Sequence, residues 1–360
     1  MMKSESISVI VPFSYSVQQP EREALLHHVV NDCLTPQTYE QKRIILVESG
    51  TERTQEKFAD NTGLEYMFIQ KPDGGFSLGQ MQDMAIAITN PGELFYLHLP
   101  DYLLPKDAIE RAYFLMKQTN APCIFPHYGA VYLTKPITEG ITEKKIDWPP
   151  FLEAISDVTE SEGFRDYENL IPVDGNSNRV QLTERQTEHL DTVLPDGYKS
   201  HELIGLSTLG LWGGDTKKLF SFYPWMESSG NDEALGIFRS GPRAKSSYLC
   251  RTDAFIEVGG TSVNRTGWNV EDLWFWERIR TRFMGYTIDK HGIYFDGFKL
   301  SGRYPITHLW HSTNFNNKYY SDAKAAIDEF HVFEALSREQ KMARIHSLDV
   351  ELLRNEVQNG

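Results

Sequence analysis

The chain of 360 residues carries a formal net charge of −14 and is 40% hydrophobic, which is normal for a globular protein of one large or two ordinary domains. Because nucleic-acid affinity comes largely from clustered Lys and Arg, this acidic balance argues against a broad phosphate-binding surface. Cys33, Cys123 and Cys250 are widely spaced, so we expect neither a disulfide framework nor a cysteine-based zinc site, and a cytoplasmic setting fits best.

We expect no transmembrane segment. No apolar run approaches the roughly 20 residues that cross a bilayer. Residues 1–8 also lack the long apolar stretch of a signal peptide. Any contact with a membrane would therefore be peripheral.

The first hundred residues alternate between strand and helix patterns. Residues 7–13 read ISVIVPF, a short β-branched run that predicts a buried strand, and residues 21–33 have apolar side chains at helical spacing. The alternation continues with strands over 43–47, 66–70 and 94–98 and a helix over 76–89. This order is typical of an α/β fold with a doubly wound, mainly parallel sheet.

A lone carboxylate follows the last of these strands. Residues 94–98 run into Asp101, and a helical pattern over 107–117 begins shortly afterwards. Open α/β sheets bind ligands at the carboxyl ends of their strands. Mg²⁺ and Mn²⁺ prefer oxygen ligands, several of which a nucleotide diphosphate supplies. We therefore predict a divalent metal at Asp101; the alternative is a turn or cap residue.

The second half of the chain is less regular. A strand is expected over 123–125, whereas residues 134–201 are polar and lack sustained periodicity. We interpret that stretch as an insertion or irregular subdomain, either plain surface elaboration or an acceptor-binding lid. Short strands are expected over 293–295 and 306–311.

The C-terminal residues 322–357 are helical in pattern, with a break near Ser337. Their charges are mixed in sign, which is typical of a packing or oligomer helix and not of a membrane anchor.

Four segments occur in the order found in GT-A glycosyltransferases. They are VIVP at 9–12, IILVESGT at 44–51, LPD at 99–101 and GWNVED at 267–272. The first half of the chain resembles family 2 glycosyltransferases. The second half resembles the galactosyltransferase-type segment that β-1,4-galactosyltransferases, polypeptide N-acetylgalactosaminyltransferases and bacterial chondroitin-type polymerases share. The resemblance covers about residues 7–130 and 245–315.

The resemblance implies a nucleotide-sugar site in the first half. Pro12 and Phe13 would line the nucleotide pocket, and Glu48 stands where the family usually has an Asp that contacts the base. Gly79 and Asp83 match a family pattern of Phe, Gly and Asn ahead of the metal strand, with Asp83 in place of the Asn.

The resemblance also implies Mn²⁺ or Mg²⁺ as cofactor. The family motif reads Asp-any-Asp, whereas this chain has LPD. Asp101 therefore matches either the second motif carboxylate or the acidic residue that often follows it, and the latter alignment puts His98 at the first motif position. The family has a metal-binding His near His308 and His311; we favour His308, and spacing alone does not choose.

The pair Glu271 and Asp272 is the more specific signal, because it follows GG at 259–260 and GW at 267–268 at family-like spacing. An inverting transfer needs one carboxylate to take the acceptor hydroxyl proton. Asp272 is the candidate base, Glu271 would bind the acceptor or donor sugar, and Trp268 would stack on a sugar. The alternatives are an exposed acidic pair at a helix start and a core aromatic.

The sequence thus predicts an α/β GT-A fold with an inserted irregular subdomain and a helical tail. We divide it into a nucleotide-sugar-binding half (1–133), an insertion serving as acceptor or lid region (134–240), an acceptor and catalytic half (241–318) and the tail (319–360).

The predicted function is metal-dependent, inverting transfer of a sugar from a nucleotide donor, a UDP-sugar by preference, to a hydroxyl acceptor such as a glycan, in polysaccharide biosynthesis. One alternative is a non-catalytic nucleotide- or sugar-binding GT-A-like protein. Another is a transferase acting on modified nucleic-acid bases, which the acidic net charge disfavours.

Overall fold

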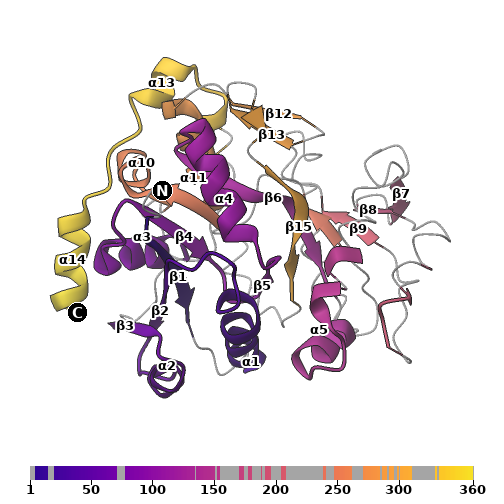
Figure 1. Cartoon of the computed structure of the whole chain (residues 1–360). Helices are drawn as coiled ribbons and strands as arrows, with labels where there is room; N and C mark the ends of the chain where they lie inside the picture. Colours follow the sequence, from indigo (N-terminus) through magenta and orange to yellow (C-terminus); the bar gives the residue numbers. More distant parts are fainter. Residues whose placement is uncertain are drawn as a thin grey trace.

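Figure 1 shows the computed structural model of the chain. The structure describes residues 5–14, 20–70, 78–133, 135–150, 152–154, 170–173, 177–180, 188, 191–195, 204–207, 238–240, 247–261, 271–283, 286–289, 292–295, 298–299, 301–309, 329–330 and 332–359.

The elements of the first half alternate as the sequence predicts. They are β1 (Ile7–Phe13), α1 (Glu21–His28), a π-helical stretch η1 (Val29–Leu34), β2 (Lys42–Gly50), α2 (Glu56–Thr62), β3 (Glu65–Gln70), α3 (Leu78–Thr89), β4 (Leu94–His98), β5 (Tyr102–Leu103), α4 (Ala108–Thr119) and β6 (Cys123–Tyr132).

The elements of the second half are shorter. They are α5 (Lys135–Thr142), β7 (Leu170–Val173), β8 (Ser177–Val180), β9 (Ile204–Ser207), β10 (Phe238–Ser240), β11 (Ser247–Arg251), α10 (Thr252–Glu257), α11 (Glu271–Phe283), β12 (Tyr286–Asp289), β13 (Gly292–Phe295), β14 (Phe298–Lys299), β15 (Ser301–His308), α13 (Arg338–Met342) and α14 (Val350–Asn359).

One large sheet organises the molecule. Its strand order is β3-β2-β1-β4-β11-β6-β10-β9-β8-β7, and β15 pairs with both β5 and β6. Strands β3, β2, β1 and β4 are parallel to one another, whereas β11 runs antiparallel between β4 and β6. Helix α3 packs against β1 and β2, and α4 packs against β6 and β11. The predicted α/β class with a doubly wound, mainly parallel sheet is confirmed.

The hydrophobic core lies around the central strands. All seven residues of β1 and all five of β4 are buried. A strand covered on both faces reads as a continuous apolar run, not as an alternating one. This coverage explains why the runs at 7–13 and 94–98 were recognisable from the sequence.

The region 134–240, which we expect to be an insertion, adds strands to the large sheet. Its described part contains the helix α5 and four short strands, and β10 joins β6 so that β7 to β10 extend the large sheet. The strand predicted over 123–125 also runs on to Tyr132, and the strand predicted over 306–311 ends at His308.

The tail folds back onto the rest of the chain. Helix α14 lies beside α3 (Figure 1), and Arg354 Nε donates to the carbonyl of Ala87 at 2.8 Å. Helix α13 is capped by Ser337, whose side chain accepts from the Gln340 backbone N–H in a capping box. The buried Lys341 Nζ lies 2.6 Å from Glu277 Oε1. The described tail therefore packs on its own chain.

Among the described helices, none is long and apolar enough to cross a bilayer.

Candidate functional site

The candidate site lies where the strand order of the sheet reverses. The chain proceeds outward from β1 to β2 and β3, and then returns to place β4 on the other side of β1. The last partners of β1 and β4 are Ile10 and Leu97, and β1 continues beyond this pair to Phe13. Open α/β sheets bind ligands in the crevice outside such a reversal. Asp101 follows β4 at this edge.

The structure brings Asp101 and His308 together from distant parts of the chain. Strand β15 pairs with β5, so that His308 faces Tyr102, and the Leu309 N–H donates to the Asp101 carbonyl at 2.8 Å. His308 Nε2 lies 3.9 Å from Asp101 Oδ2. The Asp101 side chain is 6% exposed and that of His308 is 15% exposed. A carboxylate and an imidazole thus converge near the reversal point.

A third polar side chain at this position was not predicted. Arg22, near the start of α1, places Nη2 3.5 Å from Asp101 Oδ2. Figure 1 shows α1, β5 and the end of β15 gathered in the same part of the molecule. No motif singles out Arg22, because its relation to Asp101 exists only after η1, which continues α1, packs against β5.

The separation of the two predicted ligands in this group allows them to share a divalent cation. Mg²⁺ binds ligands at about 2.1 Å, so two donor atoms that share one ion lie at most about 4.2 Å apart. The separation of 3.9 Å between Asp101 Oδ2 and His308 Nε2 meets that limit. In the described part of the chain, no group of three or more His, Cys, Asp or Glu side chains could hold a metal. A cation here would therefore need donor atoms from a ligand such as a diphosphate.

His98, the other candidate for the metal motif, is fully buried and uses both ring nitrogens within the protein. Nε2 lies 3.0 Å from the Tyr102 carbonyl, which can only accept, so Nε2 carries the proton. Nδ1 must then accept from the Ser247 hydroxyl at 2.8 Å, and Tyr96 donates to Ser247. The structure thus makes His98 a neutral link between β4, β5 and β11.

Burial lowers the pKa of His98 from its ordinary value of 6.5 to about 4. The unfolded chain consequently binds the proton first on acidification, and the folded state loses stability as the pH falls through the window from 6.5 to 4. We expect His98 to account for about 2 kcal/mol of the stability that the protein loses between pH 7.5 and pH 5.0.

Urea unfolding at these two pH values checks this expectation. In the variant His98→Gln, which does not titrate, the loss should be smaller by about that amount. An equal loss in both proteins would contradict the assignment.

Glu48 is fully buried at the end of β2 and is bound by protein donors. It accepts from the Thr54 N–H at 2.9 Å, the Gln55 N–H at 3.1 Å and the Tyr66 hydroxyl. Burial and this hydrogen bond raise the pKa of Tyr66. Glu48 thus anchors the residues that precede α2. Its contact with a base remains a prediction, and it requires one of these donors to move.

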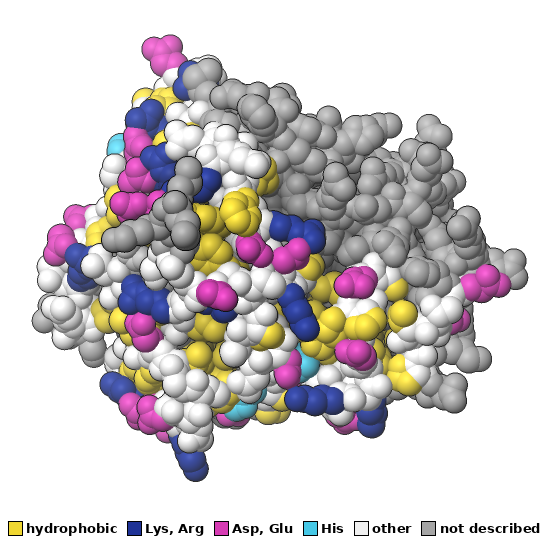
Figure 2. All heavy atoms as spheres, in the orientation of Figure 1, with side chains coloured by type: hydrophobic (Ala, Val, Ile, Leu, Met, Phe, Trp, Pro, Cys, Tyr) yellow, Lys and Arg dark blue, Asp and Glu magenta, His cyan; other side chains and the backbone are white. Residues whose placement is uncertain are grey.

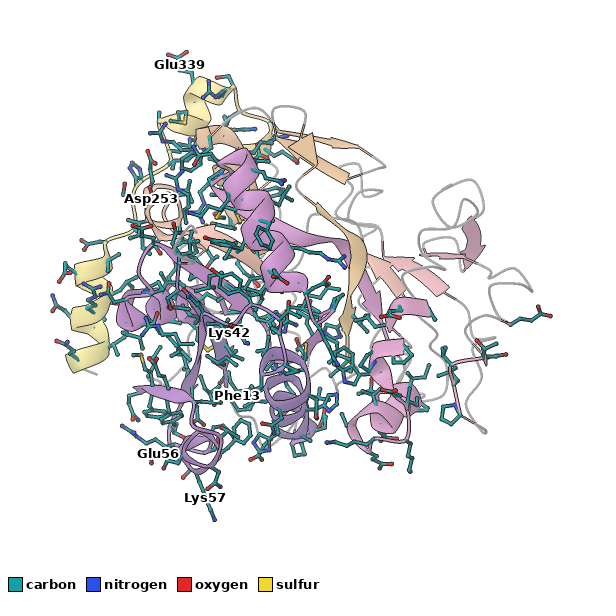
Figure 3. All side chains as sticks on the ribbon, in the orientation of Figure 1. Phe13, Lys42, Glu56, Lys57, Asp253 and Glu339 are labelled. Carbon is teal, nitrogen blue, oxygen red and sulfur yellow. The ribbon has the colours of Figure 1, made fainter. Side chains whose placement is uncertain are left out.

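Pro12 and Phe13 close β1 next to Glu48. Phe13 is the strand partner of Glu48, and its side chain is 1% exposed (Figure 3). Phe13 therefore packs in the core, and the role of both residues in lining a nucleotide pocket remains a prediction.

Asp83 and Gly79 lie on a buried face of α3 that meets the second half of the chain. Asp83 Oδ1 accepts from the Thr261 N–H at 2.6 Å, and the Thr261 hydroxyl lies 2.8 Å from Asp83 Oδ1 and 3.0 Å from the Gly79 carbonyl. In this structure both residues join the two halves of the chain. Their part in donor binding remains a prediction.

The backbone geometry beside this junction explains why both positions are glycine. Gly259 and Gly260 have φ values of +80° and +65°, and a Cβ on Gly260 would lie 2.3 Å from Asp83 Oδ1. Arg278 donates to the Gly260 carbonyl at 2.7 Å and to the Gly259 carbonyl at 3.2 Å. Burial lowers the pKa of Arg278 to about 10, so it stays charged at neutral pH opposite the Asp83 carboxylate.

Helix α11 begins at the predicted acidic pair. Glu271 is 4% exposed, so it is not the solvated helix-start residue of the alternative interpretation. The structure describes Asp272 only through its backbone in the first turn. Trp268 and His311 lie outside the described residues.

The described surface agrees with the acidic composition. On the face in Figure 2, Lys and Arg side chains alternate with Asp and Glu, and the described atoms show no broad basic patch.

Comparisons with known proteins give matches only at the level of structure. No protein-family model matches the chain, and no curated sequence does. S. aureus TarS in complex with UDP-GlcNAc matches at 15% identity over 35% of this chain and 35% of that chain, with a TM-score of 0.29.

A second solved structure aligns with more of the chain. Glucosyl-3-phosphoglycerate synthase from Mycobacterium tuberculosis, in complex with Mn²⁺, UDP and phosphoglyceric acid, matches at 10% identity over 91% of this chain and 77% of that chain, with a TM-score of 0.39.

Proposed function

We propose that the protein is a metal-dependent, inverting GT-A glycosyltransferase that moves a sugar from a UDP-sugar to a hydroxyl acceptor, a glycan by preference. The observation that carries this proposal is the convergence of Asp101 and His308 beside the strand-order reversal. A carboxylate and an imidazole at that edge suit a cation held jointly with a diphosphate.

Asp101 and His308 would hold the cation. The cation, when bound, supplies positive charge that stabilises the departing diphosphate. Asp272 takes the proton of the acceptor hydroxyl while its oxygen attacks the anomeric carbon. The bond from that carbon to the phosphate oxygen breaks, UDP leaves with the bonding electrons, and the configuration at the carbon inverts. Glu271 orients a sugar hydroxyl.

Ligand-induced stabilisation tests this proposal. With Mn²⁺ present and UDP at about 100 times its dissociation constant, we expect the free energy of unfolding to rise by about 2.7 kcal/mol. Thermal melts with a panel of nucleotides, each with Mn²⁺ or with EDTA, measure the effect. EDTA should remove most of it, and the absence of stabilisation by every nucleotide would contradict the proposal.

A second function is favoured by the single motif carboxylate and its ion pair with Arg22. A non-catalytic protein that binds nucleotide sugars would need no second carboxylate at LPD (99–101). Release of UDP separates the two proposals. A transferase liberates UDP from the matching UDP-sugar when metal and acceptor are present, whereas a binding protein is stabilised by the ligand and liberates none.

A further inference from the structure

Arg22 holds an unusual position beside Asp101. It is the second residue of α1, its side chain is 27% exposed, and Nη2 lies 3.5 Å from Asp101 Oδ2. Charge-assisted hydrogen bonds between nitrogen and carboxylate oxygen measure about 2.7 to 2.9 Å. The contact is therefore a loose ion pair and not a tight bidentate one.

One hydrogen-bond donor of Arg22 has no acceptor among the described residues. Its Nε atom is buried, and no described residue accepts a hydrogen bond from it. The neighbouring Glu23 instead accepts from Gln55 Nε2 at 3.0 Å. A guanidinium has five N–H donors in a planar fork that matches phosphate oxygens. A buried donor without an acceptor costs stability, which a ligand that supplies the acceptor recovers.

Arg22 and a divalent cation cannot both stay close to Asp101. The guanidinium and His308 Nε2 both approach Oδ2, at 3.5 Å and 3.9 Å. A cation bound to Asp101 and His308 would repel the guanidinium at short range in a partly buried setting. A diphosphate brought to the same cation offers that guanidinium new acceptors.

We propose that Arg22 is a donor-binding residue that neutralises Asp101 before the cation arrives, and that pairs with the diphosphate oxygens of the nucleotide once the cation has taken Asp101. This inference rests on the proposed function. It gives Arg22 two effects of opposite sign: it competes with the cation for Asp101, and it adds affinity for the nucleotide.

Calorimetry on the full chain tests both effects separately. In Arg22→Gln, the affinity for Mn²⁺ without nucleotide should rise about threefold to tenfold, because the competing charge is gone. With Mn²⁺ held at a saturating concentration, the affinity for UDP should fall by a similar factor. Arg22→Lys keeps the charge and loses the fork, so its Mn²⁺ affinity should stay near that of the wild type while its UDP affinity is reduced.

Arg111→Gln serves as the matched control. Arg111 is 56% exposed and pairs with Asp107 on α4, so its loss should change neither affinity. Suppose that the wild type binds Mn²⁺ and UDP. If Arg22→Gln then changes neither affinity, or lowers the affinity for Mn²⁺, this inference alone is overturned. A wild type that binds neither ligand overturns the proposed function and this inference with it.

Discussion

Replacing Asp272 with Asn is expected to lower the turnover number for sugar transfer by about a hundredfold to ten-thousandfold, while donor binding persists. A positioned general base contributes a factor of this size, and an amide cannot take the proton. The packing of α11 connects this helix to β4, the strand that precedes Asp101. Phe275, one turn beyond Asp272, stacks on Tyr248 at 4.9 Å, and Tyr248 pairs with Leu97 of β4.

Turnover and the Michaelis constants for donor and acceptor measure this effect. A general-base role predicts a loss in the turnover number with little change in the melting temperature or in UDP affinity. Asp253→Asn is the control. Asp253 lies in the first turn of α10 with its side chain 69% exposed (Figure 3), so its loss should leave turnover unchanged. Full activity in Asp272→Asn would remove Asp272 from the mechanism.

Replacing Gly260 with Ala should destabilise the protein by about 3 kcal/mol or more. A left-handed backbone costs a residue with a Cβ about 1 to 2 kcal/mol. The new Cβ would also lie 2.3 Å from Asp83 Oδ1, within a buried junction that holds Thr261 and faces Arg278. The collision forces Asp83 away from donors that have no water to replace it.

Gly63→Ala provides the matched control for the backbone term. Gly63 ends α2 with φ +69°, and a Cβ there would meet nothing within 4 Å. Its substitution should cost only about 1 kcal/mol. Equal losses in the two variants, measured by urea unfolding, would show that the contact with Asp83 contributes nothing. Adding Asp83→Ala to Gly260→Ala should cost less than the sum of the single losses, because the colliding atoms are gone.

The early strands were predictable because burial on both faces requires a continuous run of apolar residues, which can be seen in the local sequence. Residues 7–13 and 94–98 form β1 and β4 with the expected bounds. Both are short apolar runs covered on each face, and the helices between them have apolar residues at helical spacing. The fold class follows from that alternation and needs no knowledge of distant contacts.

The region 134–240 was harder to predict for a physical reason. Strands β7 to β10 have only three or four residues each, which is too short for an alternating pattern to be distinguished from a loop. Each of them is a strand because it pairs with a neighbour, and β10 joins the whole set to β6, which lies far away in the sequence.

The position of Asp101 could be inferred locally, since it follows a buried strand and precedes a helix in one continuous segment. The surroundings that give Asp101 its chemistry could not. His308 reaches it because β15 pairs with β5, and Arg22 reaches it because α1 packs at the same edge. Likewise, Gly260 must be glycine because a carboxylate on α3 occupies the space beside it. The sequence alone gives the residues and the local elements that carry them. The pairing of strands that are distant in the sequence determines which charged side chains become neighbours.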